Sequence, residues 1–231
     1  MPVDKPFLLA YLEEIMILRF AVILAGCGNK DGAEIHESVL TLLSIDRAGH
    51  QYQCFAPNIP QARVINFVTN QEMPETRNVL LEAARIARSK IKPLTDFKPQ
   101  DFDILVMPGG NGVAYNLCTF AKDGDKMTVL PEVERAVRSM HEAKKPIGAL
   151  CIAPVIIAKL LKAVSVTFGR DEKVNAIFQR LGATTIDTDA KSIVVDAKNK
   201  IVTTPCYMLD ARISELAEGI DKLIQQLIRM V

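Results

Sequence analysis

One cysteine, Cys151, stands where a nucleophile could act. It lies in the segment ALCIA, between an apolar run that predicts a strand and one that predicts a helix. A strand that turns directly into a helix makes a sharp elbow, which needs small residues two positions before and after the nucleophile, and Ala149 and Ala153 meet that need. Because free N–H groups and the helix dipole at a helix N-terminus stabilise a thiolate, we expect Cys151 to be nucleophilic near neutral pH.

The other four cysteines lack an elbow, and their ordinary interpretation is a small buried side chain. They are Cys27, Cys54, Cys118 and Cys206. The chain has no CxxC pair, no Cys/His cluster at zinc-ligand spacing, and only three histidines, which are far apart in the sequence. We therefore expect neither a disulfide framework nor a metal site.

Two carboxylates and a glycine turn could serve the cysteine. Glu34 and Glu37 lie at the start of a predicted helix, where the dipole stabilises a carboxylate whatever its function. Gly109, Gly110 and Asn111 follow a predicted buried strand, and glycines let backbone N–H groups turn towards a developing oxyanion. A plain tight turn explains the Pro-Gly-Gly sequence equally well. From the residues alone, both interpretations stay open.

A second glycine-rich loop, at 26–32, precedes the two glutamates. Its glycines have the spacing GxGxxxG, and it lacks the GK[ST] of a phosphate-binding P-loop. No acidic residue closes the following strand, as the dinucleotide-binding pattern requires. We therefore expect no nucleotide cofactor.

The elements that must position these residues alternate along the chain. Apolar runs predict strands at 19–27, 51–56, 103–107 and 146–150, with a hairpin that joins 193–195 to 201–203. Periodic apolar residues predict helices at 76–91, 132–143 and 152–161, with a further helix at each end of the series. Such alternation favours an α/β fold in which a mainly parallel sheet lies between two helix layers. Ligands of such sheets bind at the carboxyl ends of the strands, where Cys151 lies.

In the first and last helices, the spacing of apolar residues predicts which face is buried. In the first, Ile35, Val39, Leu42 and Leu43 recur with helical spacing, so this stripe is expected to cover the sheet. The last helix carries a longer aliphatic stripe between residues 213 and 228, which is also expected to dock on the sheet.

Composition and charge exclude several classes of protein. The 28 basic and 27 acidic side chains nearly cancel, and no run of five like charges occurs, so nucleic acid is not an expected partner. Residues 1–18 are interrupted by charges and resemble neither a signal peptide nor a membrane span. We expect an N-terminal extension at 1–18, a single domain at 19–231, a cytoplasmic location and no membrane contact.

Three segments together resemble the PfpI superfamily, also called the parkinsonism-associated deglycase or class I glutamine amidotransferase-like group. They are DGAEIHESV at 31–39, LVMPGGNGVAYNL at 105–117 and IGALCIAP at 147–154. The chain is still more similar to the ElbB-like branch, the enhancing lycopene biosynthesis proteins or isoprenoid biosynthesis glyoxalases. That likeness adds ETRNVL at 75–80 and KIVTTPCYML at 200–209.

The resemblance implies a flavodoxin-like three-layer sandwich, usually a homodimer, in which a glutamate from the first helix hydrogen-bonds to the elbow cysteine. Cys151 matches that cysteine, and Glu37 matches the glutamate, with Glu34 as second choice. Gly110 matches the backbone oxyanion donor, together with the N–H of Ile152. Ile152 also stands where the protease-like branch has a histidine, which argues against a peptidase or amidotransferase dyad.

The resemblance further implies a glyoxalase without a cofactor, which acts on small 2-oxoaldehydes such as glyoxal or methylglyoxal and yields 2-hydroxy acids. Two alternatives remain. In the first, the protein has a redox or stress role in which Cys151 oxidises to a sulfinate, or serves as a partner-binding module. In the second, it is an amidase-type hydrolase.

Overall fold

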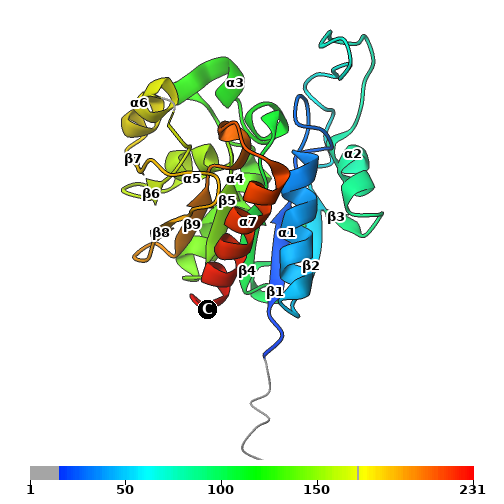
Figure 1. Cartoon of the computed structure of the whole chain (residues 1–231). Coiled ribbons are helices and arrows are strands. Elements are labelled where there is room, and N and C mark those ends of the chain that lie inside the picture. The colour runs from blue at the N-terminus through cyan, green and yellow to red at the C-terminus, as the bar shows by residue number, and fades with distance from the viewer. Residues whose placement is uncertain (1–15, 171) are drawn as a thin grey trace, which may run out of the picture.

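The computed structural model describes residues 16–170 and 172–231, and within them seven strands form one sheet (Figure 1). The strand order is β3-β2-β1-β4-β5-β9-β8. All neighbours pair in parallel except β8, which runs antiparallel to β9. The strands are β1 (Arg19–Ile23), β2 (Gln51–Ala56), β3 (Ile91–Pro93), β4 (Ile104–Met107), β5 (Ile147–Leu150), β8 (Val194–Asp196) and β9 (Ile201–Thr204).

Helices cover both faces of this sheet, so the chain has the expected flavodoxin-like α/β fold. Helices α1 (Ile35–Arg47) and α7 (Ile213–Ile228) lie side by side on one face (Figure 1). Helices α4 (Pro131–Glu142) and α5 (Pro154–Leu160) contact each other and the opposite face, and α2 (Val79–Ile86) lies at the β3 edge.

Shorter elements complete the described chain. A two-stranded sheet of β6 (Ser165–Val166) and β7 (Thr184–Thr185) lies beside α6 (Glu172–Arg180). The single-turn elements are α3 (Phe120–Asp123), the 3-10 turns η2 (Leu94–Asp96), η3 (Pro99–Asp101), η5 (Gly124–Lys126) and η6 (Cys206–Met208), and the π-helical turn η4 (Val113–Leu117).

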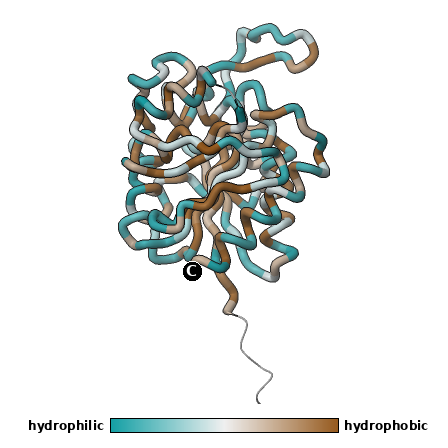
Figure 2. Tube along the Cα trace, turned by 60° about the vertical axis from the view of Figure 1, so that its left-hand side comes forward, coloured by the Kyte–Doolittle hydropathy of each residue, from teal (hydrophilic) through white to brown (hydrophobic). Residues whose placement is uncertain are grey.

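The central strands form the core. Every residue of β4 and β5 is buried, as expected of parallel strands that are covered on both faces. Figure 2 shows the hydrophobic segments gathered in the middle of the molecule, with hydrophilic ones around them. Because the core surrounds β5, the residue that follows it is held by a rigid support.

Most predicted elements are confirmed, with shifted ends. The strand at 51–56 and the hairpin are present, and α4 matches the predicted helix within one residue at each end. The helix predicted at 76–91 is wrong at both ends. It begins after Asn78, whose side-chain oxygen accepts from the Leu81 N–H, and it stops before Arg88 and Ser89, which have left-handed backbone. The following residues form β3 instead.

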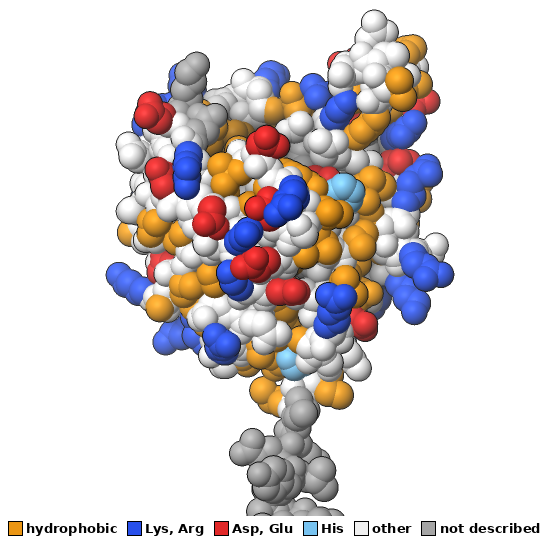
Figure 3. Space-filling model, viewed as in Figure 1, with side chains coloured by type: hydrophobic (Ala, Val, Ile, Leu, Met, Phe, Trp, Pro, Cys, Tyr) orange, Lys and Arg blue, Asp and Glu red, His pale blue; other side chains and the backbone are white. Residues whose placement is uncertain are grey.

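The predicted buried face of α1 is also wrong. Ile35, Val39 and Leu43 are 43%, 46% and 37% exposed, and of the predicted stripe only Leu42 is buried. Hydrophobic side chains accordingly gather on the surface over α1 and α7 (Figure 3). The face that packs inwards is mostly polar and consists of Glu37, Ser38, Thr41, Leu42, Ser44 and Ile45.

None of the helices in the described part of the chain is both long and apolar enough to cross a bilayer. The N-terminal extension expected at 1–18 lies mostly outside the described residues, since the description begins at Met16.

Candidate active site

Cys151 follows β5 without a spacer, at the carboxyl edge of the sheet. Its φ of 56° lies in the left-handed region, which a residue other than glycine adopts at a cost on the order of 1 kcal/mol. The Cys151 N–H donates to the carbonyl of Thr204 in β9 at 2.9 Å, and Ala149 and Ala153 are fully buried around the turn. The sheet therefore forces the tight elbow that the sequence predicts.

Glu37 reaches the thiol from the first turn of α1. Its side chain is completely buried and hydrogen-bonded to the thiol of Cys151. One carboxyl oxygen, Oε2, accepts from the Gly109 N–H at 2.9 Å, and the other, Oε1, accepts from the Tyr207 N–H at 3.5 Å. These contacts hold the carboxyl group against the sulfur.

Glu34 has a different position. It caps α1, because its Oε2 accepts from the Glu37 N–H at 2.7 Å. Its own N–H donates to the carbonyl of Gly109 at 2.9 Å, which ties the helix start to the glycine turn. Of the two expected carboxylates, Glu37 is the one that contacts the thiol.

The glycine turn packs against both groups. A Cβ atom on Gly109 would lie 2.4 Å from Cβ of Cys151 and 2.7 Å from Oε2 of Glu37, so no larger residue fits there. Gly110 has a φ of 98°, and its N–H, like that of Ile152, hydrogen-bonds to the Cys151 sulfur. Two backbone N–H groups therefore point at the Cys151 sulfur.

Asn111 does not join them. Its side chain is exposed and its N–H donates to the carbonyl of Asn29 at 2.8 Å, so that N–H is not free to serve as an oxyanion donor. Of the residues predicted to form the site, the structure brings together Cys151, Glu37, Gly109, Gly110 and Ile152.

Burial dominates the electrostatics of the pair. It raises the pKa of Glu37 to about 8, the charge of Glu34 adds to the effect, and the Gly109 N–H opposes it. Burial and the charge of Glu37 also raise the pKa of the Cys151 thiol, while the N–H groups of Gly110 and Ile152 lower it. Glu37 is therefore mostly protonated at neutral pH, and the thiol and the carboxyl group titrate as a coupled pair.

The expected lowering of the thiol pKa by a helix N-terminus is thus wrong. Helix α5 begins only at Pro154, and the three preceding residues form a turn. Cys151 as a whole is also only 7% exposed, so removal of water from the thiol outweighs the dipole.

Three residues at this edge were not expected. Cys206 and Tyr207 follow β9, and Cys206 is fully buried with a φ of 45°. The Tyr207 hydroxyl lies 2.9 Å from Nδ1 of His36, which precedes Glu37 on α1. The segment KIVTTPCYML, which contains both Cys206 and Tyr207, carried part of the family resemblance and was the available signal.

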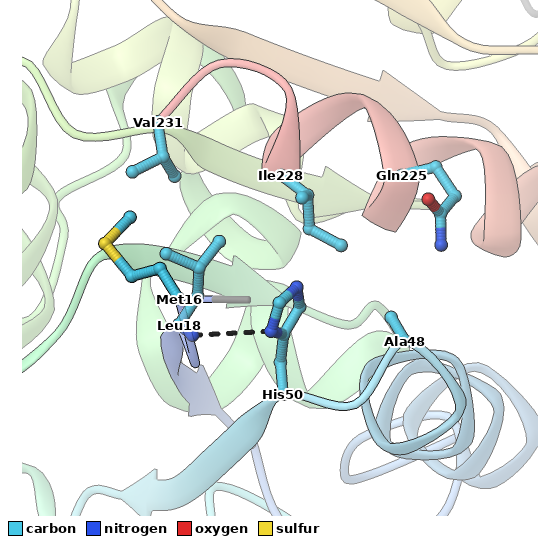
Figure 4. Close-up of a pocket in the computed structure, with 7 residues that line it drawn as sticks. All are labelled: Met16, Leu18, Ala48, His50, Gln225, Ile228 and Val231. Carbon is cyan, nitrogen blue, oxygen red and sulfur yellow. Dashed lines mark hydrogen bonds between the residues drawn. The ribbon is translucent and has the colours of Figure 1, made fainter. Parts of the chain in front are cut away.

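A pocket of about 420 Å³ lies at the opposite end of the sheet (Figure 4). Leu18, Ile228 and Val231 line it with apolar atoms, and Nδ1 of His50 accepts from the Leu18 N–H at 3.3 Å. It contains no nucleophile and is separate from the Cys151 site. Among the described residues, no group of three or more His, Cys, Asp or Glu could hold a metal ion.

Comparisons with known proteins agree with this architecture. The sequence profile of the DJ-1/PfpI family matches residues 29–207. The human protein "Glutamine amidotransferase-like class 1 domain-containing protein 3, mitochondrial" is 40% identical over 222 residues, which cover 92% of this chain and 83% of that protein. The zebrafish (Danio rerio) "ES1 protein, mitochondrial" is 32% identical over 230 residues, with 91% and 85% covered.

One solved structure is similar over nearly its whole length. It is an isoprenoid biosynthesis protein with amidotransferase-like domain from Ehrlichia chaffeensis, with a TM-score of 0.87 and 39% identity. The superposition covers 92% of this chain and 99% of that one.

Proposed function

This chain belongs to the DJ-1/PfpI family, and from that premise we propose that it is a cofactor-independent glyoxalase. Its substrates are small 2-oxoaldehydes such as glyoxal and methylglyoxal, and its products are 2-hydroxy acids. The observation that carries the proposal is the contact between the Cys151 thiol and the buried carboxyl group of Glu37, whose pKa is raised to about 8. A nucleophile and a proton carrier at one point are what this isomerisation needs.

The reaction can proceed through these residues alone. After the pair loses a proton, the Cys151 sulfur adds to the aldehyde carbon, and the N–H groups of Gly110 and Ile152 stabilise the oxyanion. Glu37 gives its own proton to the neighbouring carbonyl oxygen, takes the proton from the carbon that carries the sulfur, and returns it to the neighbouring carbon, which leaves a thioester beside a new hydroxyl group. Water then cleaves the thioester and releases the acid and the thiol. One carbon is oxidised and its neighbour reduced, so no redox cofactor enters the balance.

The shape of the site supports small substrates. Cys151 is only 7% exposed and Glu37 is fully buried, so little of the reacting pair is accessible to a substrate. An aldehyde carbon with a small neighbouring group can approach the sulfur there, whereas a peptide bond in a folded chain cannot.

The amidase alternative has less support. Ile152 occupies the position of the histidine that would serve as its base, and the imidazole of His36, on the first turn of α1, is hydrogen-bonded to Tyr207. The names of two similar proteins contain "amidotransferase-like", but those words describe the relatives and not this chain.

The experiment is turnover of a panel of 2-oxoaldehydes by the wild type and by Cys151→Ala. We expect the wild type to convert methylglyoxal to lactate and glyoxal to glycolate without glutathione or metal, and Cys151→Ala to form neither. Glutamine serves as the control substrate, from which no ammonia should be released. Release of ammonia, or lactate formation by Cys151→Ala, would overturn the proposal.

We still propose that the protein is cytoplasmic, and fractionation of the native cell tests this location. The human and zebrafish relatives are named as mitochondrial proteins, so recovery of this protein in an organelle fraction would refute the cytoplasmic assignment. The homodimer implied by the family resemblance also remains a prediction, and the exposed stripe on α1 offers a place to test it.

A further inference from the structure

Two cysteines stand at the carboxyl edge of the sheet. Strands β5 and β9 are neighbours, and Leu150 pairs with Thr204. Cys151 follows Leu150 directly, and Cys206 comes two residues after Thr204. The hydrogen bond from the Cys151 N–H to the Thr204 carbonyl continues the pairing up to the elbow. The sheet itself therefore holds the two cysteines on adjacent strand ends.

The turn after β9 keeps Cys206 beside the site. β9 ends at Thr204, and Cys206 begins the 3-10 turn η6 with a φ of 45°. The N–H of the next residue, Tyr207, donates to Oε1 of Glu37 at 3.5 Å, and Glu37 is hydrogen-bonded to the Cys151 thiol. A disulfide between the two cysteines requires Cα atoms roughly 4.4 to 6.8 Å apart. Cys27, by contrast, follows β1, and β4 lies between β1 and β5.

Both thiols lie close to Glu37 of α1. The Cys151 thiol is hydrogen-bonded to Glu37 of α1, and the charge of Glu37 also acts on the Cys206 thiol. The Cys206 thiol is hydrogen-bonded to the Thr204 hydroxyl. That hydroxyl lies 3.1 Å from where a Cβ atom on Gly219 of α7 would stand.

We propose that Cys206 is a resolving thiol, which closes a reversible disulfide with Cys151 after a hydroperoxide has oxidised Cys151. Nothing in the glyoxalase proposal uses Cys206, and the new reaction requires no aldehyde. Full burial protects Cys206 from direct attack by an oxidant, whereas Cys151 is slightly exposed and is oxidised first.

The reaction balances in two steps. First, the Cys151 sulfur attacks one peroxide oxygen, the O–O bond breaks, Cys151 becomes a sulfenic acid, and an alcohol (or water) leaves with the thiol proton. Second, the Cys206 sulfur attacks the Cys151 sulfur, the S–S bond forms, and the S–O bond breaks. Hydroxide leaves as water with the proton of Cys206, which Glu37 is placed to carry. In total, two thiols and one hydroperoxide give one disulfide, one alcohol and one water.

This reaction has a consequence for the nucleophile. Without a resolving thiol, further peroxide converts the sulfenic acid to a sulfinic acid, which thiols do not reduce. With Cys206 in place, oxidation stops at a disulfide that an ordinary reductant opens.

The test is a map of cysteine oxidation. The reduced full-length protein is treated with one equivalent of hydrogen peroxide, alkylated, digested without reductant and analysed by mass spectrometry. We expect the peptides of Cys151 and Cys206 to be joined with the loss of two hydrogen atoms, and dithiothreitol to separate them. In Cys206→Ser, Cys151 should instead be trapped as a sulfenic acid by dimedone, and excess peroxide should give several-fold more sulfinate than in the wild type.

A matched control is Cys54→Ala, which removes a buried thiol from β2 and should leave the Cys151–Cys206 link unchanged. The proposal is overturned if wild-type Cys151 forms sulfinate as fast as it does in Cys206→Ser, or if Cys151 links to Cys27. The wild-type map decides the question even if Cys206→Ser does not fold.

Discussion

Helices α1 and α7 lie side by side on the same face of the sheet, yet they bury opposite kinds of side chain. Helix α7 buries an aliphatic stripe: Leu216, Ile220, Leu223, Ile224 and Leu227. Helix α1 buries mostly polar residues, and its aliphatic stripe faces outwards. The difference teaches that α7 stabilises the core, whereas α1 is oriented to deliver Glu37 to Cys151.

The polar face of α1 can be buried at little cost because its polar atoms have partners. The Ser38 hydroxyl donates to the Glu34 carbonyl at 2.6 Å, and the Thr41 hydroxyl donates to the Glu37 carbonyl at 2.7 Å. A hydroxyl that is bonded within its own helix leaves no unsatisfied group in the core. Turning the aliphatic stripe inwards would remove Glu37 from the sulfur.

The largest expected effect comes from the acid on α1. Glu37→Gln keeps the shape of the side chain but cannot carry a proton, so glyoxalase activity should fall by about a hundredfold or more. The measurement is kcat/KM for methylglyoxal. Glu34→Gln is the control and should lose much less, because a glutamine oxygen can still accept from the Glu37 N–H. Equal losses in the two variants would break the distinction between proton carrier and cap.

A substitution on α7 should do the reverse. Leu223 is fully buried, and Leu223→Ala should lower the free energy of unfolding by about 2 to 5 kcal/mol, through lost burial and a cavity. Urea titration measures this change. Activity per folded molecule should match that of the wild type, and a large loss of kcat in the folded variant would show that α7 also serves the site.

The pH dependence of stability separates the helices further. Because the pKa of Glu37 is raised to about 8 in the folded chain, well above the ordinary glutamate value of about 4.3, the native state binds the extra proton. This contribution is fully present below the unfolded pKa and is lost as pH rises through about 8. A pKa change of one is worth about 1.4 kcal/mol, so a loss on the order of 4 kcal/mol between about pH 5 and pH 9 is expected.

The measurement is the urea midpoint across that pH range, in the wild type, Glu37→Gln and Leu223→Ala. The wild type and Leu223→Ala should show the same decrease of stability with rising pH. Glu37→Gln should lack most of that decrease. A slope that survives in Glu37→Gln would assign the proton to another group.

The smallest effect is expected on the outer stripe of α1. Val39 is 46% exposed, so Val39→Ser should change the free energy of unfolding by no more than about 0.5 kcal/mol. Thermal unfolding at several protein concentrations tests this. A larger loss that depends on concentration would indicate that a second copy of the chain covers the stripe.

The strands, the helices and the nucleophile could be predicted from the sequence more reliably than the face that each helix buries. The elbow was predictable because small residues around Cys151 have a steric cause that acts locally. The orientation of α1 was not predictable from its apolar spacing, since the rotation that serves Glu37 overrides the rotation that would bury Val39.

Electrostatic and long-range features could not be predicted in the same way. The raised pKa of the thiol depends on burial and on the exact start of α5, which the apolar run at 152–161 does not mark. The proximity of Cys206 to Cys151 depends on which strands are neighbours, and the chain order places β9 far from β5.

The pH dependence of turnover tests the central claim most directly, namely that Glu37 is the proton carrier for Cys151. In a profile of kcat/KM for methylglyoxal between about pH 6 and pH 9.5, wild-type activity should rise through an apparent pKa near 8. In Glu34→Gln the inflection should move to lower pH, because the charge of Glu34 is one cause of the raised pKa of Glu37. Glu37→Gln should lie far below both and show no inflection there. A Glu37→Gln enzyme that keeps the wild-type rate and the wild-type inflection would contradict the account.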